Sequence, residues 1–334
     1  MIRWQILLLS TTVGSSLALN IQFDYSYDTQ GFFAGANASR RAVLEAAAER
    51  IERRVAEVLP GLVPIGGNSW SLGFPHPGTG QAVTLENPSL PADTVVIYVG
   101  GRPRSDGFIA YAEYSYNWNG DGNWVALWQA RDGANSFQSI GGSISFNSDT
   151  TWYFDPDVRT VESFSGYDFF SLAQHEIAHL LGFTDGAAAF RTRVSSGTFV
   201  GLNAVALYGA GVPLASGLDH FGAGIEYRGF QANMTPFFST GTRTPFTELD
   251  FAVLNDIGYA THAPEEVRLV QMARSGNEIT LAWTGGVGPF AIESNLDLSS
   301  ETWTRRTNPL PAAEAATVMM QSATEFFRLI DLGR

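Results

Sequence analysis

Two histidines and a glutamate in one short segment have the types and spacing that could do the most specific chemistry in this sequence. Residues 174–183 read QHEIAHLLGF, so His175 and His179 are four positions apart and Glu176 directly follows the first of them. On a helix, side chains at i and i+4 lie on one face, about 6 Å apart. Both imidazoles can therefore reach one zinc ion. This H-E-x-x-H pattern predicts a zinc site with Glu176 as general base.

The chemistry expected of such a site is hydrolysis. Zinc lowers the pKa of a bound water towards about 7, and Glu176 can accept a proton from this zinc-bound water. The same group can then deliver the proton to the leaving amine of a peptide bond. A structural zinc site needs no such carboxylate, so Glu176 favours catalysis. The alternative is a helix with two surface histidines and no metal.

A catalytic zinc needs a third protein ligand, with water in the fourth position. Asp185 would complete the pattern H-E-x-x-H-x-x-G-x-x-D, in which Gly182 lets the chain turn back to the ion. His220, which lies 41 residues after His179 (220 − 179), is the other candidate. Asp185 could instead cap the turn after the helix, and His220 could be an ordinary loop histidine. The residues alone leave both candidates open.

The elements that must position these residues are predicted from the spacing of apolar side chains. Residues 168–181 are expected to form the metal-binding helix, with Asp168 as N-cap and Gly182 just past its end. Other helices are expected at 38–59 and 248–257, the latter opening on a capping-box pattern. Expected strands are 20–30, 94–99, 142–147, 279–283, 290–294 and 325–330. Residues 61–92 are expected to form a long loop, and residues 183–246 show little periodicity.

Residues 169–259 resemble the leishmanolysin-like group of the metzincin clan of zinc peptidases. The H-E-x-x-H-x-x-G-F start is followed by Asp219-His220-Phe221, by A-N-M-T-P at 232–236 and by a segment ending in D-I-G-Y at 256–259. In that group an insertion precedes the third zinc histidine, and a methionine-containing turn follows it. The resemblance implies that His220 is the third ligand and that Met234 forms an apolar floor beneath the ligands.

The resemblance also implies a metzincin-like domain, built from a twisted mixed sheet and the active-site helix. Alternating apolar residues after residue 266 predict a small all-β sandwich, so the expected fold class is α+β. An edge strand at Ser143–Phe146 is expected to pair with extended substrate, although an interior strand fits that segment equally well. One departure from the group is Asn233, where Leu is frequent.

The chain is expected to be an exported protein with two folded parts. Residues 1–18 combine Arg3, an apolar run and small residues before a cleavage site after Ala18, which is typical of a secretory signal peptide. A buried first strand is the alternative. Residues 19–260 are the predicted peptidase domain, 261–265 a linker and 266–334 the β sandwich, an accessory or attachment module. The expected location is secreted, periplasmic or cell-surface.

Composition excludes several classes of function. The 334 residues include 33 acidic and 20 basic side chains, a net charge of −13, and no cysteine. A nucleic-acid partner is not expected, because phosphate binding needs a basic surface. Disulfides and thiolate ligands are impossible, and no mature segment is apolar for the roughly 18 residues that a membrane span needs. The segment Asn117–Asn123 weakly resembles a calcium loop, although such clusters are usually turns.

The sequence thus predicts a secreted zinc-dependent endopeptidase that acts on protein or peptide substrates. Two alternatives stay open. One is a non-catalytic secreted binding or adhesion protein with a structural zinc site, and the other is a zinc hydrolase that acts on a non-peptide bond. Neither the cleavage preference nor the oligomeric state is indicated by the residues.

Overall fold

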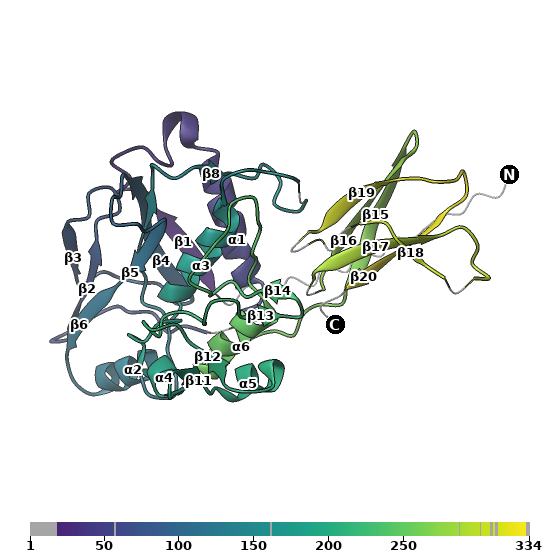
Figure 1. Cartoon of the computed structure of the whole chain (residues 1–334). Coiled ribbons are helices and arrows are strands. Elements are labelled where there is room, and N and C mark those ends of the chain that lie inside the picture. Colours follow the sequence, from purple (N-terminus) through teal and green to yellow (C-terminus); the bar gives the residue numbers. More distant parts are fainter. Residues whose placement is uncertain are drawn as a thin grey trace.

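The computed structural model describes residues 19–331, apart from residues 57, 161, 287, 301, 308, 309, 311 and 312. The predicted signal peptide, residues 1–18, lies outside this part. The described chain folds into helices and several separate sheets (Figure 1), so the expected α+β class is confirmed. None of the described helices is long and apolar enough to cross a bilayer.

A four-stranded sheet forms the centre of the larger part of the molecule. Its order is β1–β4–β7–β5; the first three strands run parallel, and β5 runs antiparallel to β7. The bounds are β1 (Asn20–Asp24), β4 (Thr94–Arg102), β5 (Ala110–Glu113) and β7 (Gly142–Asn147). Val95, Ile97 and Val99 of β4 belong to the core cluster that includes the apolar residues of helices α1 (Arg40–Glu52) and α3 (Phe169–Leu180). Val96 and Tyr98 point the other way, to an aromatic cluster.

The edge strand of this sheet beside helix α3 is β5 and not β7. The expected edge strand, Ser143–Phe146, lies in β7, which pairs with β4 on one side and with β5 on the other. All four of its residues are buried. The expectation of an edge strand there is therefore wrong. The reason is topological: the chain places β5 alongside β7, where it covers the edge that β7 would otherwise expose.

Residues 61–92, expected to be a loop, contain two strands. β2 pairs with β3 and β6 in a second sheet of order β3–β2–β6. Trp70, Leu72 and Phe74 of β2 point inward and meet Trp124 and Trp128 of helix α2. The expectation is wrong because the many glycines and prolines of the segment hide an ordinary period-two pattern. The bounds are β2 (Ser69–Pro75), β3 (Ala82–Glu86), β6 (Ser115–Asn119) and α2 (Asn123–Arg131).

Helix α3 (Phe169–Leu180) carries the H-E-x-x-H residues and confirms the predicted helix. The Asp168 carboxylate accepts hydrogen bonds from the N–H (3.3 Å) and the hydroxyl (2.6 Å) of Ser171, so Asp168 is the N-cap. Past the end of the helix Gly182 has a φ of 97°, which favours glycine. A Cβ there would lie 2.3 Å from a ring carbon of Phe137. Backbone conformation and packing therefore both require glycine.

Helix α1 (Arg40–Glu52) packs against α3 and is shorter than the predicted 38–59. Beyond it Val55 forms an isolated β-bridge with Thr261, and the Ala56 N–H donates to the carbonyl of Ala260. Val55 is nevertheless fully buried. The apolar spacing that suggested a longer helix therefore continues into a segment that is extended and not helical.

Helix α6 follows a region of short elements and confirms the predicted capping box. Thr247 and Asp250 exchange hydrogen bonds at its start. Near its end the Asp256 carboxylate accepts from the N–H groups of Asn203 and Ala204, both at 2.9 Å, and so holds helix α5. The bounds are η1 (Gly35–Asn37), β8 (Trp152–Tyr153), β9 (Tyr167–Asp168), α4 (Ala188–Arg191), β10 (Val194–Ser195), β11 (Thr198–Phe199), α5 (Leu202–Tyr208), β12 (Val212–Pro213), β13 (Glu226–Tyr227), β14 (Phe230–Gln231) and α6 (Glu248–Asp256).

Residues 266–331 form the C-terminal β region, which has an apolar cluster of its own (yellow-green to yellow in Figure 1). Two three-stranded sheets, β15–β16–β19 and β18–β17–β20, contribute to that cluster. Ile279 and Trp283 come from the first sheet, and Phe290 and Ile292 from the second. The bounds are β15 (Arg268–Ser275), β16 (Glu278–Thr284), β17 (Phe290–Asn295), β18 (Thr304–Arg305), β19 (Ala315–Met319) and β20 (Phe326–Asp331).

Candidate metal centre

Three histidines from two segments of the chain converge on one point. The Nε2 atom of His175 lies 3.1 Å from Nε2 of His220 and 3.2 Å from Nε2 of His179. His175 and His179 are one turn apart on α3, and His220 comes from the segment between β12 and β13. Among the described residues, this is the one group of three or more His, Cys, Asp or Glu side chains placed to hold a metal ion.

The spacing of the three nitrogens fits a metal ion. Nitrogens about 2.0–2.1 Å from a tetrahedral zinc ion are separated from one another by about 3.3 Å. The observed separations of 3.1 and 3.2 Å are close to that value. Imidazole nitrogen also suits copper, iron and nickel. The geometry therefore defines a possible metal site without fixing the metal.

Backbone carbonyls orient two of the imidazoles. Nδ1 of His175 lies 2.9 Å from the carbonyl oxygen of Asn233, and Nδ1 of His179 lies 2.8 Å from that of Phe183. With the ring proton on Nδ1, each imidazole donates to its carbonyl and leaves Nε2 free for a metal.

All three imidazoles are held in the neutral form that metal binding requires. Burial, followed by the neighbouring histidines, lowers the pKa of His175 well below its usual range. Burial also lowers the pKa of His179. For His220, burial and the nearby His179 lower the pKa to about 4. At pH 7 protons therefore do not compete for the three nitrogens.

The turn formed by Asn233 and Met234 supports two of the three ligands. The Asn233 carbonyl faces His175, and the Met234 carbonyl accepts from the N–H of Phe221 (2.7 Å), which directly follows the third histidine. The N–H groups of the same two residues donate to the buried Asp250 carboxylate, at 3.1 and 3.0 Å. Met234 is fully buried, as an apolar floor requires. One carboxylate on α6 thus fixes the turn on which the ligands rest.

The aspartate that was the alternative third ligand lies outside the histidine cluster. The backbone N–H of Asp185 donates to the Asp219 carboxylate at 2.9 Å, and the Thr184 hydroxyl donates to it at 3.0 Å. Burial and the Asp219 charge raise the pKa of Asp185. Asp219 directly precedes His220, so these bonds tie the loop after α3 to the segment of the third histidine. The structure brings His220, and not Asp185, to the two helix histidines.

Glu176 is buried beside the histidines, with 5% of its surface exposed. Burial raises its pKa to about 8, although the Arg104 charge and the backbone N–H of Ala112 act in the opposite direction. A cation bound nearby would favour the ionised carboxylate by direct attraction. Glu176 is therefore suited to exchanging a proton with a group in the cleft near neutral pH.

The site opens into a cleft with a cavity of about 860 Å³. All of strand β5 lines this cleft together with the three histidines and Glu176. Phe238 packs edge to face on His175, with 5.2 Å between ring centroids. Phe108 and Phe237 also line the cleft and are 52% and 71% exposed. The cleft therefore combines a strand edge, apolar rings and the candidate metal centre.

Sequence reasoning missed the residues that support the ligands. Asn233 attracted notice only as a departure from the resembled group, and Asp250 only as part of a capping box. Asp219 attracted notice only as the residue before His220 in the resembled block. The partners through which they support the ligands are 16 to 58 residues away in the chain. The capping box was the one local signal that pointed to any of these contacts.

The weakly predicted calcium loop, Asn117–Asn123, forms the end of β6, a turn and the start of α2. Gly122 in that turn has a φ of 53°. Asp121 donates its N–H to the side-chain oxygen of Asn68. Calcium binding at this segment stays a prediction.

Comparison with known proteins assigns the chain to no family. No family model matches it, and no curated protein and no solved structure matches it either. The likeness to metzincins stays a resemblance in four short sequence blocks. The chemistry of the three histidines and Glu176 is therefore the basis for a functional conclusion.

Proposed function

We propose that this chain is a zinc-dependent endopeptidase that hydrolyses peptide bonds in protein or peptide substrates. The observation that carries the proposal is the position of Glu176. This buried carboxylate directly follows His175 in the chain and lines the same cleft, of about 860 Å³, as three histidine nitrogens spaced for one metal ion. Structural zinc sites are closed by four protein ligands, whereas catalytic sites have three and an open position. Three ligands beside a cleft favour catalysis.

A zinc ion held by His175, His179 and His220 would act as a Lewis acid that polarises the scissile carbonyl and makes water more acidic. Glu176 supplies the proton transfer. Its carboxylate accepts a proton from the attacking water, and the resulting carboxylic acid donates that proton to the leaving amine. Burial raises the pKa of Glu176 and a bound cation would lower it, and these opposing effects suit a group that must both take up and release a proton.

Strand β5 is the proposed binding site for the main chain of the substrate. It is the last strand of the central sheet and lines the cleft. An extended peptide can add to such an edge through backbone hydrogen bonds, which tolerate many side chains. The exposed rings of Phe108 and Phe237 offer apolar contacts beside it. The expected substrate is therefore an extended or unfolded segment of protein.

The test is hydrolysis of casein by the purified protein and by two variants, with zinc content measured for each. Glu176→Gln keeps the size of the side chain but removes the base. Glu86→Gln changes an exposed glutamate on β3, outside the residues that line the cleft, so it is the matched control. The proposal predicts cleavage by the wild type and by Glu86→Gln. It predicts a loss of about 10²–10⁴-fold in Glu176→Gln with zinc retained.

Two results would contradict the proposal. Zinc-loaded wild type that cleaves no protein or peptide would favour a secreted binding or adhesion protein with a structural zinc site. Cleavage of small esters or amides, without any cleavage of proteins or peptides, would instead indicate a zinc hydrolase that acts on a different bond.

We also propose that the protein acts outside the cytoplasm, as a secreted, periplasmic or cell-surface protein. The support is the signal-peptide pattern of residues 1–18. Mass spectrometry of exported protein should find Leu19 as the first residue. Exported protein that still begins at Met1 would contradict this part of the proposal.

A further inference from the structure

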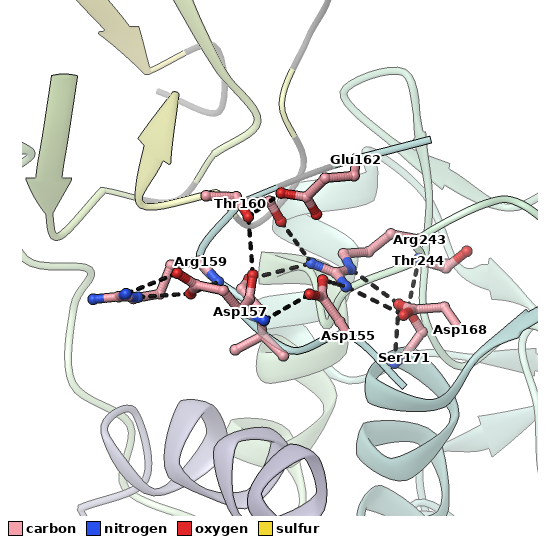
Figure 2. Close-up of polar contacts among 10 residues, drawn as sticks. Asp155, Asp157, Arg159, Thr160, Glu162, Asp168, Ser171, Arg243 and Thr244 are labelled. Carbon is pink, nitrogen blue, oxygen red and sulfur yellow. Dashed lines mark hydrogen bonds and ion pairs between the residues drawn. The ribbon is translucent and has the colours of Figure 1, made fainter. Parts of the chain in front are cut away.

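A buried arginine outside the histidine cluster uses every hydrogen-bond donor of its guanidinium. Arg243 donates through Nε and Nη2 to Asp168, through Nη2 to Asp155, and through Nη1 to the carbonyls of Val158 (3.2 Å) and Thr160 (3.0 Å). Figure 2 shows both carboxylates bound to it. A guanidinium has five N–H donors, and here all are paired. The side chains of the three charged residues are each 1% exposed.

On its inner side this arginine holds the start of the metal-binding helix. Its partner Asp168 is the N-cap of α3, and the N–H of the next residue, Thr244, donates to the Ser171 hydroxyl at 2.8 Å (Figure 2). The Asn233 side chain donates to the carbonyls of Ser171 and Thr244, at 3.0 and 2.6 Å. The carbonyl of the same Asn233 faces Nδ1 of His175. Arg243 is therefore linked to a metal ligand by its peptide bond to Thr244 and two further hydrogen bonds, Thr244 to Asn233 and Asn233 to His175.

On its outer side the same arginine holds a loop that contacts the C-terminal β region. The Val158 and Thr160 carbonyls bind Arg243, while the carbonyl of Arg159 between them accepts from the N–H groups of Glu314 (2.6 Å) and Ala315 (3.1 Å). The Glu314 side chain also pairs with an arginine just past the end of α1, at 3.4 Å. One three-residue stretch is thus bound from both sides, by Arg243 and by the C-terminal β region.

We propose that Arg243 is a positioning residue for the metal centre and transmits the docking of the C-terminal β region to helix α3. The inference rests on the proposed metal function and concerns how that site is regulated. Docking fixes the loop at Arg159, the loop and Asp155 fix the guanidinium, and the guanidinium fixes Asp168 and the adjoining Thr244. A displaced C-terminal β region loosens the N-terminal end of α3 and the carbonyl that orients His175, which lowers metal affinity.

The first test replaces Arg243 by lysine, which keeps the charge but offers three donors without the planar fork. Zinc affinity is measured by competition with a chelator, and Co²⁺ absorption reports the geometry of the metal. Changes in residues that orient metal ligands typically cost about 10–100-fold in affinity. We expect a loss of that size in Arg243→Lys, together with an altered Co²⁺ spectrum.

The matched control is Arg131→Lys. Arg131 is fully buried and donates to the carbonyls of Ser139 and Pro60, in a part of the core that does not contact the N-cap of α3. This variant should lose stability but keep native zinc affinity and a native Co²⁺ spectrum. Equal zinc affinity in the wild type and Arg243→Lys would overturn the inference, and so would an equal loss in both variants.

The second test examines the link to the C-terminal β region in the full chain. Glu314→Pro removes the N–H that donates to the Arg159 carbonyl, whereas Glu314→Ala removes only the side chain. We expect a loss of zinc affinity of at most about 10-fold in the proline variant, the low end of the range for residues that orient metal ligands, because Glu314 itself contacts no ligand. Almost no loss is expected in the alanine variant. If the proline also unfolds the C-terminal β region, docking is lost in that case too. The expected loss of zinc affinity is therefore the same as for a folded proline variant.

Combining the two changes tests whether docking of the C-terminal β region affects the metal centre through Arg243. If docking acts through it, Arg243→Lys with Glu314→Pro should bind zinc as weakly as Arg243→Lys alone. Additive losses, or native affinity in Glu314→Pro, would overturn the inference and leave the proposed function intact. A wild type that binds neither zinc nor Co²⁺ would instead overturn the proposed metal centre, and the inference with it.

Discussion

Replacing Asp250 by asparagine tests how far the metal ligands depend on a carboxylate of another helix. This carboxylate accepts from the N–H groups of Asn233 (3.1 Å), Met234 (3.0 Å) and Thr247 (2.7 Å), and from the Thr247 hydroxyl (2.6 Å). The bond from Met234 goes to Oδ1 and the others go to Oδ2. The best orientation of an asparagine keeps its oxygen at the Oδ2 position. Its NH₂ group then faces the Met234 N–H.

The size of the effect follows from this geometry. One buried N–H loses its acceptor, which costs about 1–3 kcal/mol. Removal of a buried charge offsets part of this cost, because burial raises the pKa of Asp250 and so disfavours its ionised form. We expect the free energy of unfolding of the metal-free protein to fall by about 1–2 kcal/mol. Zinc affinity should fall by about 10–100-fold, because the Asn233–Met234 turn orients His175 and supports the segment of the third histidine.

The assay compares Asp250→Asn with Asp256→Asn by chelator competition for zinc and by urea unfolding of the metal-free proteins. Asp256 is also a nearly buried carboxylate on α6, but it accepts from Asn203 and Ala204 and so holds α5 instead of the metal-site turn. Both variants should be destabilised, and only Asp250→Asn should lose zinc affinity. Native zinc affinity in Asp250→Asn, or the same loss in both variants, would show that the Asp250 carboxylate does not position the metal ligands.

His220→Ala should abolish stoichiometric zinc binding and Asp185→Ala should preserve it, because only His220 lies with the helix histidines; metal analysis with the opposite pattern would exchange the two assignments. Gly182→Ala should cost at least about 2 kcal/mol, since its φ is 97° and a Cβ would meet a buried ring at 2.3 Å, whereas the nearest atom to a Cβ at Gly186 is 3.5 Å away. Urea unfolding that fails to separate Gly182→Ala from Gly186→Ala would contradict this. Burial raises the pKa of Glu293, but hydrogen bonds and charges from two arginines outweigh it, so the net pKa is lowered. The ionised Glu293 therefore contributes its full stabilisation above its pKa in the unfolded chain, about 4.3. This stabilisation is lost as the pH falls through the lower pKa that Glu293 has in the folded protein. Between pH 6 and pH 3 the Tm of Glu293→Gln should change less with pH than the Tm of the wild type. The same pH dependence in both proteins would contradict a lowered pKa for Glu293.

Local signals made helix α3 predictable from the sequence. Its apolar residues recur at helical spacing, Asp168 can cap it, and Gly182 takes the left-handed conformation just past its end. The two helix histidines follow from their spacing on that helix. The capping box at Thr247 and Asp250 was predictable for the same reason. In each case the partners lie within about one helical turn of each other.

The contacts between distant segments could not be predicted in this way. Alternation along residues 142–147 indicates a strand but not its neighbours, so the order β4–β7–β5 was not accessible. Val55 is buried, as a helical spacing of apolar residues predicts, but its backbone is extended and forms a β-bridge. Arg243 stands alone in a segment rich in threonine and glycine, and its carboxylate partners are 75 and 88 residues away. The resemblance, and not the spacing, singled out His220.

Zinc K-edge X-ray absorption of the zinc-loaded wild-type protein is the most direct test of the central claim, an open three-histidine metal centre. We expect three imidazole nitrogens and one oxygen from solvent in the first coordination shell, at about 2.0–2.1 Å. Four protein ligands, or two imidazoles with a carboxylate in place of the third, would contradict it. The first of these results would indicate a closed structural site, and the second would return Asp185 as the third ligand.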